Sequence, residues 1–233
     1  ILEENKRYAE RMKTAMKLRY EPVACKLIKA GEEFPACCNK PAEQITHCQA
    51  VFKAKEGESF ALTAADEACH VGAAVLGMMP TPEKVATGEF HGGMGMFDSN
   101  EAAKEMIDKR YIVSEKTIGE AICPLKNADF IPDVVILVDI AERIYWVVPL
   151  EVAAKGGRVE FSTAPYQCCC EDVMAVPMCT DRPNISLGCF GCRKRTNMQK
   201  DEMAIGIPYG RIKGYVEHLD KYESGVMAKA KRD

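Results

Sequence analysis

Half of the cysteines in this chain are concentrated in residues 166–195, which read YQCCCEDVMAVPMCTDRPNISLGCFGCRKR. The segment ends in a Cys-x-x-Cys pair, Cys189 and Cys192, with Gly188 before the pair and Gly191 inside it. Glycine adopts positive φ values without strain, so such a turn can bring both sulfurs to one centre. A single pair supplies two ligands, and further ligands must come from elsewhere in the chain. The segment therefore predicts metal binding or thiol chemistry.

The composition is that of an ordinary globular protein, with 47% hydrophobic residues, 28% charged residues and a formal net charge of −3. At 233 residues the chain can bury a sizeable core without disulfides, and no linker, repeat or low-complexity tract divides it. We therefore expect a single domain over residues 1–233. The charge balance does not indicate a nucleic-acid partner, and the basic residues 193–195 are expected to form a solvated turn.

No apolar run approaches the ~20 residues that a membrane span requires, and the first residues are charged rather than signal-like. We therefore expect a cytoplasmic protein with no membrane partner. Cysteines are not expected to form disulfides in a reducing compartment. Metal or redox chemistry is then the leading explanation for the presence of twelve cysteines in the chain.

Three further cysteines are predicted to lie in the first turns of helices. Thr46 would cap a helix whose first turn holds Cys48, and Asp66 would cap one whose first turn holds Cys69. A third helix would place Cys170 in the same way. The N–H groups and positive dipole end of a helix start favour a thiolate or an anionic cluster. A buried, unreactive thiol is the alternative for Cys48 and Cys69.

The remaining cysteines carry less information. Cys25 and Cys123 lie in predicted strand or proline-adjacent packing positions, so we expect both to be core thiols. Cys37 and Cys38 lie in a loop after Pro35 and could be ligands or bystanders. Among the three consecutive cysteines of residues 168–170, helical neighbours point to different faces, and Cys170 is the one we expect to face a common centre.

The fold prediction depends on one apolar run and on the order of the elements. Residues 133–138 form a continuous apolar run that is typical of a strand buried on both faces. Strands are also expected over residues 158–162, 184–187 and 203–207, the last two flanking the Cys-x-x-Cys pair. Strands and helices alternate along the chain. This predicts a single α/β or α+β domain with a mixed β-sheet flanked by helices.

Several motifs resemble the DUF169 family, uncharacterised proteins of anaerobic archaea and bacteria, over nearly the whole chain. The motifs are Pro22-Val23-Ala24, Thr46-His47-Cys48, Cys69 with the later Leu76-Gly77, Pro124-Leu125 before Pro132-Asp133-Val134-Val135, Gly156-Gly157-Arg158, and Asn184-Ile185-Ser186-Leu187-Gly188-Cys189-Phe190-Gly191-Cys192-Arg193. In this resemblance Cys170 matches the usual cysteine position. His70 departs from the usual proline, and Cys168, Cys169 and Cys179 are extras. The resemblance implies an anaerobic habitat in which iron–sulfur clusters survive.

The first functional hypothesis is a protein that binds a [4Fe–4S] cluster and takes part in redox or small-molecule chemistry. Four thiolates hold such a cluster, and three ligands would leave an iron open to a substrate. Either a small-molecule substrate or an electron-transfer partner would fit. The candidate metal ligands are Cys48, Cys69, Cys170, Cys189 and Cys192.

The second hypothesis is a structural zinc site in a scaffold or interaction protein without catalysis, because zinc accepts the same thiolates. A thiol oxidoreductase that uses Cys189 and Cys192 is a third reading. It is disfavoured because the pair is predicted to lie between two strands and not at a helix start. No catalytic triad, HExxH motif or nucleotide loop is visible, so the sequence assigns no reaction. Alanine and methionine in the first helix, and the weakly charged residues 73–82, predict a homo-oligomer.

Overall fold

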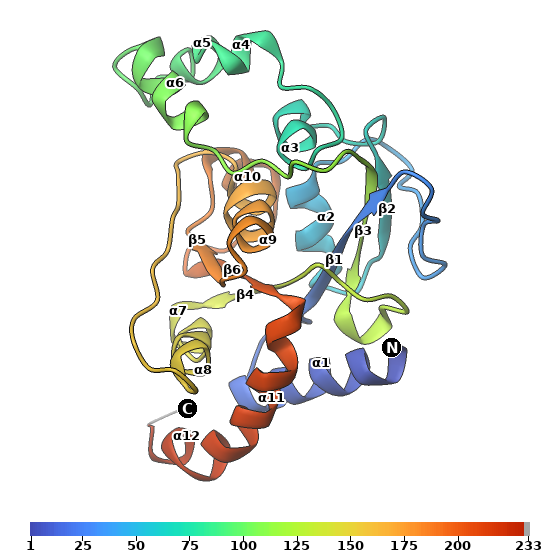
Figure 1. Cartoon of the computed structure of the whole chain (residues 1–233), viewed down its shortest axis with the longest axis vertical. Helices are drawn as coiled ribbons and strands as arrows, with labels where there is room; N and C mark the ends of the chain where they lie inside the picture. The colour runs from blue at the N-terminus through green and yellow to red at the C-terminus, as the bar shows by residue number, and fades with distance from the viewer. Residues whose placement is uncertain (231–233) are drawn as a thin grey trace.

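The computed structural model describes residues 1–230, and within them six strands form one sheet in the order β2-β3-β1-β4-β6-β5 (Figure 1). The predicted combination of helices and sheet is confirmed as a mixed α+β fold. The neighbouring strands all pair antiparallel, and parallel contacts between described residues are confined to two isolated bridges. The expected mixture of strand directions is therefore not found among the strands of residues 1–230. The strands are β1 Val23–Lys29, β2 Phe60–Thr63, β3 Thr117–Pro124, β4 Val134–Ile140, β5 Asn184–Ser186 and β6 Glu202–Pro208.

Helices cover both faces of this sheet, and a further group of helices lies at one end of the molecule (Figure 1). One face carries α1 Leu2–Met16, α7 Ala141–Ile144, α8 Val147–Val152, α11 Tyr209–Ser224 and α12 Val226–Lys229. The other carries α2 His47–Ala54, α3 His70–Val75, the π-helix η2 Cys168–Ala175, α9 Val176–Thr180 and α10 Phe190–Arg195. The end group comprises α4 Glu83–Ala86, α5 Glu89–Gly92 and α6 Asn100–Asp108, while η1 Leu125–Asn127 follows β3.

Strand β4 shows how the sheet divides the core. Val134, Ile136 and Val138 belong to the apolar cluster beneath α2 and η2. Val135 and Leu137, which point the opposite way, belong to the cluster beneath α1 and α11. The prediction of a strand buried on both faces is confirmed, because every one of these five side chains is at most 3% exposed.

The strand expected at residues 158–162 is absent from the described structure. The segment lies beside β5, but its hydrogen bonds go to the side chain of Asn184 and not to the β5 backbone. The Ser162 N–H donates to Asn184 Oδ1 at 2.8 Å, and the Asn184 amide donates back to the Ser162 carbonyl at 2.6 Å. This exchange satisfies the backbone of Ser162 without a ladder, and residues 158–162 form no strand.

The apolar residues behind the homo-oligomer prediction are buried within the chain. Met12 and Met16 of α1 are fully buried against the sheet, and Ala73 and Leu76 are equally buried on the other face. These residues have intrachain partners, so they no longer support assembly. The oligomeric state stays a prediction.

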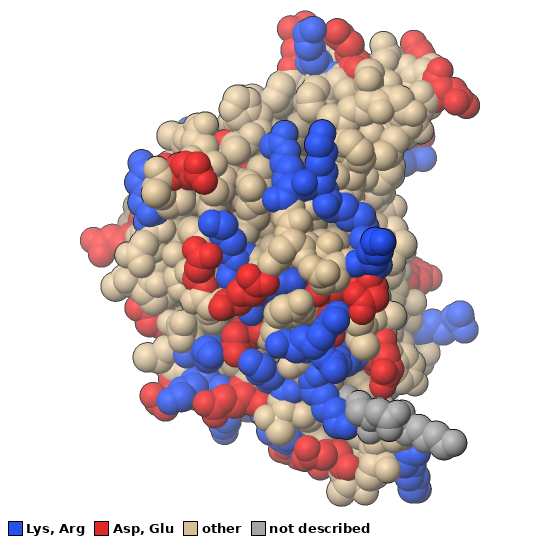
Figure 2. All heavy atoms as spheres, turned by 180° about the vertical axis from the view of Figure 1, so that it is seen from behind, with Lys and Arg blue, Asp and Glu red and all other residues tan. Residues whose placement is uncertain are grey.

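Charged side chains of both signs are interspersed on the face seen in Figure 2, without one large basic surface. This distribution agrees with the formal net charge of −3. Among the helices of residues 1–230, none has the length and apolar character needed to cross a membrane.

Candidate metal centre

A cavity of about 660 Å³ opens where the starts of α2, α3, η2 and α10 meet. The structure brings all of the predicted ligands to this cavity, although they come from widely separated parts of the chain. Apolar side chains such as Val71, Val85 and Phe90 form much of the remaining wall. The cysteines in the lining are Cys48, Cys69, Cys170, Cys189 and Cys192.

Cys48 is positioned by a capping box around Thr46, the residue that the sequence predicts as N-cap. Thr46 Oγ1 accepts a hydrogen bond from the Gln49 N–H at 3.1 Å, and Gln49 Oε1 accepts one from the Thr46 N–H at 2.9 Å. This exchange defines where α2 begins and places Cys48 in its first turn. The predicted helix start is therefore confirmed.

Cys69 lies at a helix start, but the predicted cap was wrong. Asp66 accepts hydrogen bonds from the Thr63 N–H and hydroxyl, at 3.0 and 2.7 Å, and so closes the turn after β2. Cys69 itself occupies the N-cap position of α3. A different carboxylate holds it, because Glu67 Oε1 accepts the Cys69 N–H at 2.8 Å.

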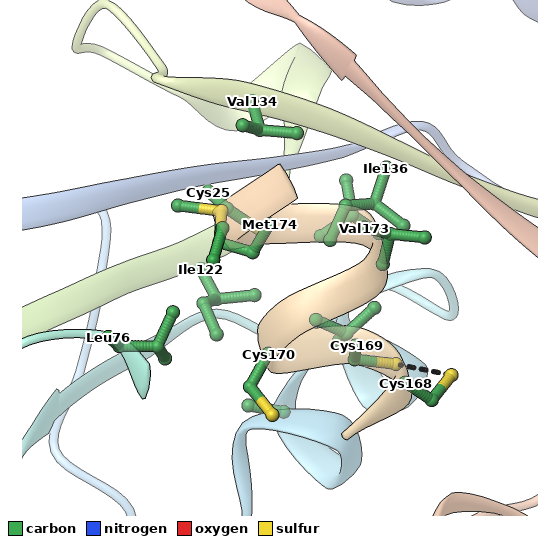
Figure 3. Packing of buried hydrophobic residues seen from close by; sticks show 14 of the residues in the cluster. Cys25, Leu76, Ile122, Val134, Ile136, Cys168, Cys169, Cys170, Val173 and Met174 are labelled. Atoms are coloured by element: carbon green, nitrogen blue, oxygen red, sulfur yellow. Dashed lines mark hydrogen bonds between the residues drawn. The ribbon is translucent and has the colours of Figure 1, made fainter. Parts of the chain in front are cut away.

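The three consecutive cysteines begin the π-helix η2, and their sulfurs do not all lie on one side of it. Cys168 and Cys169 have sulfurs 3.7 Å apart, whereas Figure 3 shows the Cys170 sulfur on another side of the helix. Cys170 lines the cavity and lies against Gly72 of α3, where an added Cβ would be 3.6 Å from the Cys170 Cβ. Cys170 is thus the member of the three that faces the cavity.

The Cys-x-x-Cys pair opens a helix, which corrects the prediction that it lies between strands. It follows β5, and Cys189 is the N-cap of α10. The Cys189 sulfur accepts the Cys192 N–H at 3.3 Å, a contact that an oxygen usually makes at a helix start. The geometric objection to thiol oxidoreductase chemistry at this pair therefore does not hold.

A tighter sulfur group adjoins the cavity, and the sequence prediction missed one of its members. The sulfurs of Cys48, Cys169 and Cys192 all lie within 4.8 Å of one another. Cys169 and Cys192 are 4.0 Å apart. The three consecutive cysteines in the sequence indicated that one of them could join such a group. Which of them contacts Cys192 depends on the backbone path of η2.

Neighbouring thiols shift one another's pKa values in opposite directions. Hydrogen bonds from Cys169 and Cys192 lower the pKa of Cys48, although burial opposes the shift. Hydrogen bonding to Cys168 raises the pKa of Cys169. Burial raises the pKa of Cys170. The raised pKa values keep Cys169 and Cys170 as neutral thiols, and a bound metal would be needed to hold several of these sulfurs as thiolates together.

A buried ion pair lies directly beneath the start of α2. His47 Nδ1 and Glu120 Oε2 are 2.7 Å apart, and both side chains are at most 1% exposed. Burial alone would lower the pKa of His47, but the Glu120 carboxylate outweighs it and raises that pKa to about 9. The imidazole is consequently charged at neutral pH and adds a positive charge beside Cys48.

Several buried polar atoms in the cavity lining lack hydrogen-bond partners among residues 1–230. They are His47 Nε2, His91 Nδ1, the Tyr166 hydroxyl and the side-chain amide of Gln167. Burial, together with the nearby Arg110, lowers the pKa of His91 to about 4, so its ring is neutral. Buried polar groups are normally satisfied. Unpartnered polar atoms in an apolar cavity are the kind of groups that orient ligands in binding sites.

The other cysteines lie away from this cavity. Cys25 is fully buried in β1, as predicted for a core thiol, and Cys179 is exposed. Cys123 is fully buried in β3, also as predicted, but it approaches Cys37 and Cys38 on the far face of the sheet. The structure therefore contains two separate thiol groups.

The fold and the site together define an α+β protein with a cysteine-lined cavity and two thiol groups that could hold a metal. A profile of the DUF169 family, described as uncharacterised ArCR, matches residues 11–218, and the chain belongs to this family. The chain is 31% identical over 218 residues to Uncharacterized protein MJ0308 of Methanocaldococcus jannaschii, an alignment that covers 92% of this chain and 93% of that protein. No solved structure matches the chain significantly.

Proposed function

We propose that this chain binds a [4Fe–4S] cluster in the wall of the cavity. The observation that carries the proposal is that five cysteines at four helix starts line one cavity, namely Cys48, Cys69, Cys170, Cys189 and Cys192. The irons of a cube-shaped cluster lie at alternate corners, so their thiolates approach from different directions. Cysteines on four different helices suit that requirement, and one of the five would remain free.

The size of the cavity favours a cluster beside a ligand site over a closed structural ion. Structural zinc sites are enclosed by their four ligands. Here the candidate ligands border about 660 Å³ of space. The unpartnered atoms of His91, Tyr166 and Gln167 lie in the same lining. A small molecule with hydrogen-bonding atoms and an apolar body would fit these walls.

When bound, the cluster would supply either electron transfer or, with an open iron, Lewis-acid chemistry. The residues of the chain would hold the small molecule next to it. The charged His47, beside Cys48, would favour the anionic thiolates and could donate from Nε2 towards the cavity. An electron-transfer partner remains the alternative to a small-molecule substrate.

A single zinc ion is the second candidate, and one observation favours it. Zn–S bonds of about 2.3 Å at tetrahedral angles place the sulfurs about 3.8 Å apart. The sulfurs of Cys169 and Cys192 are 4.0 Å apart, and Cys48 lies within 4.8 Å of both. A zinc ion in this group would make the chain a scaffold without metal chemistry of its own.

The two candidates use different members of the consecutive cysteines, so one pair of variants separates them. Cys170→Ser should remove most of the iron from anaerobically prepared protein if the cluster proposal is right. Cys169→Ser, a change one residue away in the same helix, should leave most of it. If Cys169→Ser loses metal while Cys170→Ser keeps it, and the metal is zinc, the zinc candidate replaces the cluster.

A further inference from the structure

A second thiol group lies on the face of the sheet opposite the cavity. The sulfurs of Cys37, Cys38 and Cys123 all lie within 4.8 Å of one another. Cys37 and Cys38 belong to the connection between β1 and α2, whereas Cys123 lies in β3. Segments far apart in the sequence thus bring three thiols to one point.

The sheet separates this group from the first. Cys25 of β1 and Cys123 of β3 lie on adjacent strands, where Ala24 pairs with Cys123 and Cys25 pairs with Ile122. Cys25 belongs to the apolar cluster on the cavity side. Cys123 belongs, with Cys38, to the cluster beneath α1. Metal binding at one group therefore does not require the other.

We infer that Cys37, Cys38, Cys123 and Asp129 form a site for a single zinc-like divalent ion. The sulfurs of Cys37 and Cys38 are 3.8 Å apart, which equals the spacing of about 3.8 Å expected around tetrahedral zinc. Asp129 Oδ1 lies 3.1 Å from the Cys37 sulfur and supplies an oxygen at the edge of the group. The Asp129 carboxylate lies outside the set of atoms that are all within 4.8 Å of one another, and its side chain would turn inward to supply the fourth ligand. Zinc accepts three thiolates and one carboxylate.

The surroundings fit a closed, structural site. Cys123 is fully buried and Cys38 is 8% exposed, while Cys37 and Asp129 lie towards solvent and leave a route for the ion. The ion would tie residues 30–46 to the strand β3. That connection leads directly into α2, so the site would also steady the helix start that carries Cys48. The bound ion then stabilises the folded state, because the unfolded chain has no preformed site.

The test is to measure zinc and iron in the same samples of full-length protein reconstituted with Zn²⁺ under reducing conditions. Wild-type protein should hold about one zinc ion per chain in addition to any iron. Cys123→Ala should lower the zinc content by about one ion per chain relative to wild type and leave iron unchanged. Asp129→Asn should release zinc to a chelator faster than wild type does. Cys25→Ala is the matched control, since it removes an equally buried thiol from the neighbouring strand, and it should keep the zinc.

Cys37→Ser provides a second variant that avoids the core, because Cys37 is only half-buried. It should also lose zinc, and Co²⁺ added in place of zinc should give tetrahedral thiolate absorption in wild type but not in this variant. Zinc retained at the wild-type level in both Cys37→Ser and Cys123→Ala would overturn the inference. So would a Cys37–Cys38 disulfide, found by mass spectrometry after alkylation under the same reducing conditions. Loss of iron from Cys170→Ser without loss of zinc would separate this site from the cavity.

Discussion

The Glu67 carboxylate joins the two helix starts that carry Cys48 and Cys69. Its Oε1 accepts the Cys69 N–H and its Oε2 accepts the His47 N–H, both at 2.8 Å. Glu67 is fully buried, and its burial, reinforced by the nearby Glu120, raises its pKa to about 8. A single side chain therefore sets the distance between two candidate metal ligands.

Glu67→Ala should loosen both helix starts, because two buried N–H groups lose their acceptor at about 1–3 kcal/mol each. We expect faster loss of metal to a chelator and a lower free energy of unfolding. Glu67→Gln keeps one acceptor oxygen and should give an intermediate result. Glu58→Ala, which changes an exposed carboxylate, serves as the control. Metal retention in Glu67→Ala equal to that of the control would contradict this role.

Lys55, the residue just after α2, forms a buried ion pair with Glu202 of β6. Lys55 Nζ lies 3.1 Å from Glu202 Oε2, and neither side chain is exposed. Lys55→Met would leave the carboxylate without this partner and should lower the free energy of unfolding by about 3 kcal/mol. Lys53→Met breaks an exposed pair on the same helix and should change it by less than about 0.5 kcal/mol. Denaturant unfolding of both variants in the same metal state measures the difference, and equal effects would refute the assignment.

The Lys55–Glu202 pair also predicts that the free energy of unfolding depends on pH. Burial opposes ionisation of Glu202, but hydrogen bonds from Gln199, Tyr20 and Lys55 outweigh it and lower its pKa below the ordinary 4.5. A lowered pKa in the folded state contributes stability above pH 4.5, which is lost as the pH falls through the folded-state value. The stability gap between wild type and Lys55→Met should therefore narrow below pH 4.5. A gap that stays constant down to pH 3 would show that Glu202 ionisation does not contribute.

Removing the Tyr166 hydroxyl is expected not to lower the free energy of unfolding, unlike most substitutions of buried residues. This hydroxyl is buried in the cavity lining without a partner among the described residues, whereas the Tyr215 hydroxyl donates to Glu151 Oε2. Tyr166→Phe removes an unsatisfied group, so ligand-free protein should be as stable as wild type or up to about 1 kcal/mol more stable. Tyr215→Phe should cost about 1 kcal/mol. If both changes destabilise the protein alike in urea unfolding, the Tyr166 hydroxyl is already satisfied in the ligand-free protein.

Local sequence signals predicted much of the fold and part of the site. The Thr46 and Gln49 capping box is contained in four consecutive residues, and the apolar run of β4 needs no partner to be recognised. Features that depend on distant residues were not predictable in this way. The Glu67 contact to His47 spans twenty positions, and the His47–Glu120 pair spans seventy-three.

The errors at the cysteines have physical causes. Capping rules expect an oxygen at the N-cap, but at α10 the sulfur of Cys189 accepts the Cys192 N–H, so the helix start was hidden. The η2 segment is a π-helix with a wider turn than an α-helix, so side-chain directions counted from α-helical geometry do not apply to Cys169. The antiparallel sheet follows from pairings between distant strands, which alternation of elements does not reveal.

The measurement that tests the central proposal most directly is the metal content and visible spectrum of protein purified without oxygen. The proposal predicts brown protein with a broad shoulder near ~400 nm, and about four irons per chain in the cluster. Zinc bound by Cys37, Cys38 and Cys123 would add to the metal content but not to the colour. Colourless protein that contains zinc and no iron, even after anaerobic reconstitution with iron and sulfide, would contradict the proposal.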